Sequence, residues 1–250
     1  MIIKLPEQAD IHQLRQLWKE AFGDTDAFLD SFFGTAFALE RCRCIVENGQ
    51  VAAALYWFSC ECDGQPSAYI YAVATGKQFR GQGLCRKLMA DTHTHLKNMG
   101  YAGALLVPGD LGLREMYRAM GYEDMTGIRQ FSCRADAPIP MESIDAQQYA
   151  TLRRERLPQN AVLQEGENLR FLQTMAQFYK GEGFLLCAVK ENERLTALEL
   201  LGNAAAAPGI VATLGCTEGT FTVPGEEPFA MGIPFAPDFQ KPSYFAFAFD

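Results

Sequence analysis

A turn rich in glycine and cations is the stretch of this sequence best suited to chemistry. It reads Gln78-Phe-Arg-Gly-Gln-Gly83 and lies between a strand-like run and a helix-like run. The first N–H groups of a helix have no partner within the helix, and the helix dipole adds partial positive charge there, so such a turn can bind an anion. Gly81 and Gly83 would let the backbone approach a pyrophosphate. Four cations could reach the outer phosphates: Lys77, Arg80, Arg86 and Lys87.

Two common phosphate-binding motifs do not fit this turn. No Gly-Lys-Ser/Thr closes a P-loop, and the preceding strand lies in mid-domain without the flanking pattern of a dinucleotide fold. A second stretch, Val107-Pro-Gly-Asp followed by Met116-Tyr-Arg-Ala-Met-Gly-Tyr122, returns in shortened form as Val223-Pro-Gly-Glu followed by Ala230-Met-Gly-Ile233. The repetition predicts an internal duplication.

Hydrophobic spacing predicts the elements that would hold the turn. An antiparallel hairpin after two helices, followed by strand, helix and strand, indicates a mixed α/β fold with at least one parallel strand pair. The predicted elements of the first half are a strand at 2–5, helices at 11–21 and 27–39, a hairpin of 42–46 with 51–62, a strand at 68–74, a helix at 83–99, a strand at 102–107, a helix at 111–120 and a strand at 122–133.

The same order returns after a Pro-rich link at 136–140. We expect helices at 144–157 and 168–179, a hairpin of 185–190 with 195–201, strands near 210–214 and 220–223, and an apolar strand at 244–250. The hairpin at Cys187 is matched with the hairpin at Cys44, which leaves about 28 residues missing before Val223. That deletion would remove the glycine turn and most of the helix after it. The strands near 210–214 and 220–223 should then be antiparallel or unpaired, because a parallel pair needs a longer crossover.

Both motifs resemble those of the GCN5-related N-acetyltransferase (GNAT) superfamily. Gln78–Gly83 is similar to its Gln/Arg-x-x-Gly-x-Gly/Ala signature, and Leu113–Tyr122 is similar to its fourth-helix motif. The resemblance covers about residues 1–134. It implies a GNAT-type mixed sheet flanked by helices in domain 1–134, and a second, degenerate GNAT-like α/β repeat in 140–250 that lacks the pyrophosphate-binding loop and helix.

The resemblance also implies acetyl-CoA as the acyl donor. Its pyrophosphate would lie on the amides of Gly81–Leu84 and its pantetheine arm beside Val73–Thr75, and an acceptor amine would attack the thioester directly. The acceptor would be a small molecule or a peptide. The residues expected to bind acetyl-CoA are Val73, Thr75, Gln78, Phe79, Arg80, Gly81, Gln82, Gly83, Leu84 and Arg86.

Tyr117 stands where the family places the group that protonates the leaving thiolate. Its alternative role is an apolar helix position, because it shares a stripe with Leu113, Met116 and Met120. The histidines His12, His93 and His95 are expected at exposed positions.

The general base is open, because Tyr69–Thr75 holds no carboxylate where many relatives carry a glutamate. The candidates are Glu61 or Asp63 and the carboxylate of Asp250. Tandem relatives, the protein N-myristoyltransferases and the enhanced-intracellular-survival acetyltransferases, use their C-terminal carboxylate. A frayed terminus is the alternative for Asp250.

Composition sets the remaining expectations. A net charge of −8 disfavours a nucleic-acid partner, and no apolar run approaches the roughly 20 residues that span a bilayer. The N-terminus shows no secretory signal, so we expect a cytoplasmic protein with reduced cysteines and no metal site. Two other functions stay open: a CoA-binding regulatory protein without turnover, and a tandem aminoacyl transferase, which the acidic chain disfavours.

Overall fold

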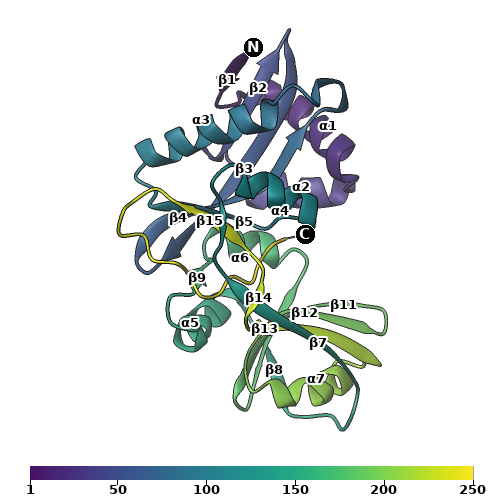
Figure 1. Cartoon of the computed structure of the whole chain (residues 1–250). Coiled ribbons are helices and arrows are strands. Elements are labelled where there is room, and N and C mark those ends of the chain that lie inside the picture. Colours follow the sequence, from purple (N-terminus) through teal and green to yellow (C-terminus); the bar gives the residue numbers. More distant parts are fainter. Residues whose placement is uncertain (250) are drawn as a thin grey trace. The chain divides into compact units, whose positions relative to one another are not determined.

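The computed structural model describes residues 1–249 and divides into two compact units (Figure 1). The first unit is made of Met1–Glu123 and Met231–Phe239, and the second of Asp124–Ala230 and the residues from Gln240 onward. This division differs from the expected ranges 1–134 and 140–250 in two places. The strand at Gly127–Arg134 belongs to the second unit, and Met231–Phe239 returns to the first.

The first unit is a mixed sheet with helices on both faces (Figure 1). Its strands follow the order β1-β2-β3-β4-β5-β15, all antiparallel except the pair β4 and β5. Its elements are β1 (Ile2–Lys4), α1 (Ile11–Phe22), α2 (Asp26–Thr35), β2 (Cys42–Glu47), β3 (Gln50–Cys62), β4 (Gln65–Thr75), α3 (Leu84–Asn98), β5 (Gly103–Leu106), α4 (Leu111–Arg118) and β15 (Met231–Pro234); β6 (Glu123–Asp124) follows α4.

The second unit holds a seven-stranded sheet in the order β14-β7-β13-β12-β11-β10-β8. Here β12 and β13 form the parallel pair. Its elements are β7 (Gly127–Arg134), β8 (Met141–Ile144), α5 (Ala146–Arg156), β9 (Val162–Leu163), α6 (Glu167–Leu172), β10 (Gln177–Gly181), β11 (Phe184–Glu191), β12 (Arg194–Gly202), α7 (Ala207–Thr213), β13 (Glu218–Pro224) and β14 (Glu227–Pro228).

The two sheets repeat one topology and exchange a strand. Strands β1 to β5 correspond in order and direction to β8, β10, β11, β12 and β13, and each sheet continues with one more antiparallel strand. In the first sheet that strand is β15, which follows the second half in the chain. In the second sheet it is β7, which follows the first half. Each half therefore supplies a strand to the other half's sheet.

Side-chain alternation along β3 divides the first unit's core between its two faces. Leu55 and Trp57 share a core with the α3 residues Leu84 and Leu88. Tyr56 points to the opposite face, where its ring lies 5.0 Å from the ring of Trp18 in α1. The hairpin at Asn48-Gly49, with both residues at positive φ, sets this register because such a turn suits the twist of paired strands. The sheet is thus buried on both faces.

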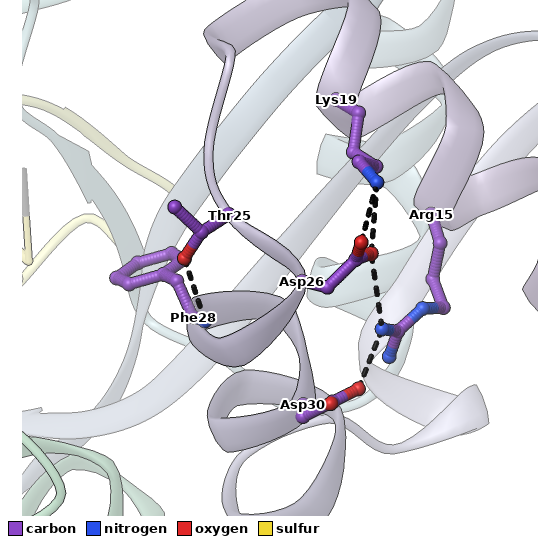
Figure 2. Close-up of polar contacts among 6 residues, drawn as sticks. All are labelled: Arg15, Lys19, Thr25, Asp26, Phe28 and Asp30. Atoms are coloured by element: carbon purple, nitrogen blue, oxygen red, sulfur yellow. Dashed lines mark hydrogen bonds and ion pairs between the residues drawn. The ribbon is translucent and has the colours of Figure 1, made fainter.

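Charged contacts fix the corner between α1 and α2 (Figure 2). Thr25 caps α2 by accepting the N–H of Phe28 at 3.2 Å. Lys19 of α1 contacts Asp26 at 2.8 Å, and Arg15 contacts Asp30 at 2.6 Å. These pairs are partly exposed, so each contributes little to stability. Their role is to orient two helices that pack by their aromatic faces.

The prediction for the second crossover is wrong in two respects. Residues 210–214 lie in or just after α7 and form no strand, and β12 pairs with β13 in parallel from Arg194↔Glu218 to Ala197↔Phe221. The alanine-rich run before Thr213 favours a helix. The second crossover spans residues 203–217 where the first spans 76–102, which is long enough to carry a short helix.

Three further expectations for the second half need correction. The hairpin of β11 and β12 corresponds to the hairpin of β3 and β4. The sequence match paired Cys187 of β11 with Cys44 of β2, so it was shifted by one strand. The helix expected at 168–179 ends at Leu172, and Gln177–Gly181 is strand β10. Residues 244–249 are mostly buried, as an apolar segment should be, yet they form no strand beyond one bridge from Tyr244 to Ala161.

All eight cysteines are free thiols, and most are buried. Among residues 1–249, no group of three or more His, Cys, Asp and Glu side chains could hold a metal ion. In the same residues, no helix is both long and apolar enough to cross a membrane.

Candidate functional site

The glycine turn forms the start of α3. Gly81 and Gly83 have φ of 77° and 72°, a region that other residues adopt at a cost, and Gly83 is the N-cap of the helix. A Cβ placed on either glycine would meet no atom within 4 Å, so the space beside this turn is open. Gly81, Gln82 and Gly83 are exposed, whereas Leu84 is buried in the core beneath them. The turn is thus an exposed stretch of backbone next to a buried residue.

Contacts from distant parts of the first unit hold the start of this turn. The backbone N–H of Lys77 donates to Oε1 of Glu20 in α1 at 2.5 Å. The side chain of Gln78 donates to Gln50 at 3.1 Å, and Nε of Arg80 donates to the Thr75 carbonyl at 3.1 Å. Glu20 and Gln50 were missed by sequence reasoning, since nothing in their spacing connects them to the turn.

Positive charge surrounds the turn. Lys77, Arg80, Arg86 and Lys87 are exposed, and within residues 1–249 none of these four cations forms an ion pair. The guanidinium of Arg86 donates to the Ala119 carbonyl at 3.2 Å, which ties α3 to the end of α4. Free amides, the N-terminus of a 15-residue helix and uncompensated cations together make this turn a candidate anion site.

A bulge opens the sheet next to the turn. Leu55 of β3 lies opposite both Ala72 and Val73 of β4, and Ala72 has an unusual φ of 48°. In the described part of the chain, the pairing of β4 with β5 ends at Tyr69↔Leu105. The rest of β4, including Val73 and Thr75, has no strand partner on the β5 side. Its backbone is therefore available to an extended ligand that continues from the turn.

Tyr117 lies near this opening, on the buried face of α4. Asp110 caps that helix by accepting the N–H of Leu113 at 2.7 Å. The Tyr117 side chain shares a core cluster with Leu84 at the start of α3. Burial raises the pKa of its hydroxyl, with a smaller contribution from Cys85, so the group is protonated at neutral pH. Its hydroxyl has no hydrogen-bond partner among the described residues. The structure thus places Tyr117 in the same core cluster as the first residue of α3, with its hydroxyl protonated.

His93 is not the exposed position that the sequence suggested. It is half-buried on α3, and its Nε2 lies 2.8 Å from the hydroxyl of the fully buried Tyr122. Burial and the nearby Lys97 lower the pKa of His93 to about 4. The imidazole is therefore neutral at pH 7 and shares a hydrogen bond with the Tyr122 hydroxyl, in which either group can be the donor. Spacing along α3 gave no sign of this contact because Tyr122 lies beyond the next helix.

The neutral state of His93 should make stability depend on pH. Its pKa is about 6.5 in the unfolded chain and about 4 in the folded protein. As the pH falls, the unfolded chain takes up the proton first, so the free energy of unfolding decreases between pH 7 and pH 4, by about 3 kcal/mol in full. Between pH 7 and pH 4.5, the free energy of unfolding of the wild type should therefore fall more than that of His93→Gln, in which this position does not titrate. Urea unfolding of both proteins at each pH measures the difference. Parallel pH profiles would show that His93 does not titrate this way.

The carboxylates considered as bases lie elsewhere or outside the described residues. Glu61 pairs with Pro66 at the far end of β4, about 20 Å along the strand from the bulge at ~3.3 Å per residue. Asp63 lies in the turn beyond it. Asp250 lies outside the described residues. The structure therefore does not bring Glu61 or Asp63 to the glycine turn.

Among the described residues of the second unit, no equivalent turn is present. Its short helix α7 follows Ala204–Ala206 and carries Pro208 in its first turn, which removes a backbone N–H. It does have a carboxylate on its fourth strand, Glu199, but Arg153 binds both oxygens at 2.7 and 2.9 Å and both side chains are buried. That carboxylate is held in an ion pair within the core.

Comparisons with known proteins agree with this geometry. Residues 3–125 match the family model of the acetyltransferase (GNAT) domain. A GCN5-related N-acetyltransferase from Kribbella flavida is similar over 92% of this chain and 70% of its own, with TM-score 0.72 and 16% identity. A conserved protein from Enterococcus faecalis V583 is similar over 94% and 72%, with TM-score 0.72 and 15% identity.

A third solved structure, a GCN5-related N-acetyltransferase from Anabaena variabilis ATCC 29413, is similar over 92% of this chain and 72% of its own, with TM-score 0.69 and 16% identity. No curated protein sequence matches. At these identities the structural likeness concerns the fold, and it extends over both units of the chain.

Proposed function

Because the chain belongs to the GNAT superfamily of acyltransferases, we propose that its first unit transfers an acetyl group from acetyl-CoA to the amine of a small molecule or peptide. The observation that carries the proposal is the glycine turn at the start of α3 beside the unpaired edge of β4. A CoA-type donor has a pyrophosphate, which suits the glycine turn, and an extended pantetheine arm, which suits the unpaired edge of β4.

In this proposal the pyrophosphate accepts hydrogen bonds from the amides of Gly81–Leu84, and the exposed cations neutralise the outer phosphates. The pantetheine arm lies along Val73–Thr75. The residues proposed to bind the donor are Val73, Thr75, Gln78, Phe79, Arg80, Gly81, Gln82, Gly83, Leu84 and Arg86. The open space in front of Gly81 and Gly83 supports this assignment, since a larger residue at either position would project into the phosphates.

The proposed chemistry is direct transfer. The acceptor nitrogen attacks the thioester carbon, the C–S bond breaks as the C–N bond forms, and Tyr117 donates its proton to the departing sulfur. The proton lost by the amine passes to water or to the terminal carboxylate at Asp250, because Tyr69–Thr75 holds no carboxylate. Most of the rate enhancement then comes from holding the two reactants together. The eight free thiols fit a reducing compartment such as the cytoplasm.

A second candidate function is CoA binding without turnover. It is favoured by the same lack of a carboxylate near the bulge. The two functions differ in one assay: release of free thiol from acetyl-CoA in the presence of a panel of small and peptide amines. Turnover that depends on an amine, and that exceeds hydrolysis without enzyme, supports the transferase. Tight acetyl-CoA binding with no thiol release by any amine would favour the binding protein.

A further inference from the structure

The strand that the second half supplies to the first sheet packs behind the candidate acid. Met231 of β15 is fully buried in the core cluster that contains Tyr117 and Tyr122. Ile233 packs against the same cluster, and its Cδ1 would lie 3.5 Å from a Cβ on Gly121, the residue before Tyr122. The exchanged strand is thus a wall of the site around α4.

Phe235, directly after β15, continues this wall to α3. Its backbone N–H donates to the Ala102 carbonyl at 2.7 Å, which fixes its position in the first unit. Its ring centroid lies 5.5 Å from that of His93, and the ammonium of Lys97 lies 5.2 Å from the same ring. An aromatic ring between two α3 side chains restricts the orientation of the imidazole.

His93 in turn fixes Tyr122 at its hydroxyl end. The Tyr122 hydroxyl shares a hydrogen bond of 2.8 Å with Nε2 of His93, and the Tyr122 backbone N–H donates to the Tyr117 carbonyl at 3.1 Å. Because Tyr122 is fully buried, a ring held at both ends has little freedom to move.

Tyr122 meets Tyr117 edge to face, with ring centroids 5.8 Å apart. Since the Tyr117 hydroxyl has no hydrogen-bond partner among the described residues, packing of its ring determines where the hydroxyl points. We propose that Phe235, His93 and Tyr122 are positioning residues that aim the Tyr117 hydroxyl, so that a segment of the second half sets the efficiency of the acid step in the first unit. This inference rests on the proposed role of Tyr117.

The inference predicts losses in kcat with little change in acetyl-CoA binding. Misplacing a reacting group by about 1 Å can cost about 100-fold, so His93→Leu and Tyr122→Phe should lower kcat by roughly 10- to 100-fold while KM for acetyl-CoA changes by less than about threefold. His93→Gln keeps a hydrogen-bond acceptor and should recover part of the loss. Phe235→Leu should produce a smaller loss in the same direction.

A matched control is available in the same unit. Tyr101, which precedes β5, and Ser59 of β3 share a hydroxyl hydrogen bond of 2.8 Å. Tyr101→Phe removes one tyrosine hydroxyl and one hydrogen bond, as Tyr122→Phe does. It should leave kcat unchanged. Urea unfolding of each variant identifies any that do not fold, and Tyr122→Phe and His93→Gln keep the test informative if His93→Leu is unstable.

The decisive measurement combines each positioning variant with Tyr117→Phe. If these residues act through the Tyr117 hydroxyl, adding His93→Leu or Tyr122→Phe to Tyr117→Phe should lower kcat by less than about threefold further. Equal losses in both backgrounds, or single variants with wild-type kcat, would overturn the inference while leaving Tyr117 as the acid. A Tyr117→Phe protein with wild-type kcat would overturn the acid assignment and the inference together.

Discussion

Replacing Tyr117 with phenylalanine should lower kcat by about 10²- to 10⁴-fold, the range that a positioned proton donor contributes. The hydroxyl is the only group removed, and it is protonated at neutral pH, as tyrosine hydroxyls ordinarily are. Without it the departing thiolate must take its proton from water. The ring stays in place, so acetyl-CoA affinity and the free energy of unfolding should change little. Steady-state kinetics and calorimetric titration measure these quantities separately.

The alternative for Tyr117 is a core residue of α4. It is 6% exposed and shares a cluster with Met116 and Met120, so the structure is compatible with that role. A core tyrosine would show normal turnover per folded molecule in Tyr117→Phe. That result would make the residue structural and would leave the leaving group to be protonated by solvent.

The second large effect is expected at Gly83, where a glutamate should lower acetyl-CoA affinity by about 100-fold or more. The new side chain projects into the open space beside the turn and places a carboxylate against the pyrophosphate. The same change also forces a larger residue into φ of 72°, which costs about 1 kcal/mol and must be separated from the charge effect.

Gly23→Glu is the matched control for this strain. Gly23 caps the C-terminal end of α1 with φ of 79°, and a Cβ there also meets nothing within 4 Å. It should lose similar stability and keep full acetyl-CoA affinity. Wild-type affinity in Gly83→Glu would place the donor elsewhere on the chain.

Local signals predicted most of the first unit. Asn48-Gly49 marks a hairpin by backbone conformation alone, and the spacing of Leu14, Leu17 and Trp18 marks the buried face of α1. The glycine turn and α3 followed from the same kind of pattern. These features depend on residues close in the chain, which is why a single sequence is enough to predict them.

The second half was predicted less well because its signals conflict. Apolar residues around Ile210 are compatible with either a strand or a helix. The alanines before them have high helix propensity and favour the helix α7. Cys187 resembles Cys44 in its neighbours, yet β11 corresponds to β3, so likeness between short apolar runs gave the wrong register. The exchange of β7 and β15 left no trace in either strand.

The site divides in the same way. The turn at Gly81–Leu84 and Tyr117 were found from motifs, whereas Glu20, His93 and Phe235 join the site through contacts that link separate elements. Glu61 lies at the end of β3, as the sequence predicted, but it pairs with Pro66, about 20 Å along β4 from the bulge at ~3.3 Å per residue. Residue spacing does not encode such distances.

Calorimetric titration of the full chain with acetyl-CoA tests the central claim most directly. Within residues 1–249, only the first unit has a glycine turn at the start of a long helix, and the second unit's α7 begins with Ala207 and Pro208. One site per chain is therefore expected, and it should disappear in Gly83→Glu. Two sites per chain, or one site that survives Gly83→Glu unchanged, would contradict the assignment of acetyl-CoA to the turn at Gly81–Leu84.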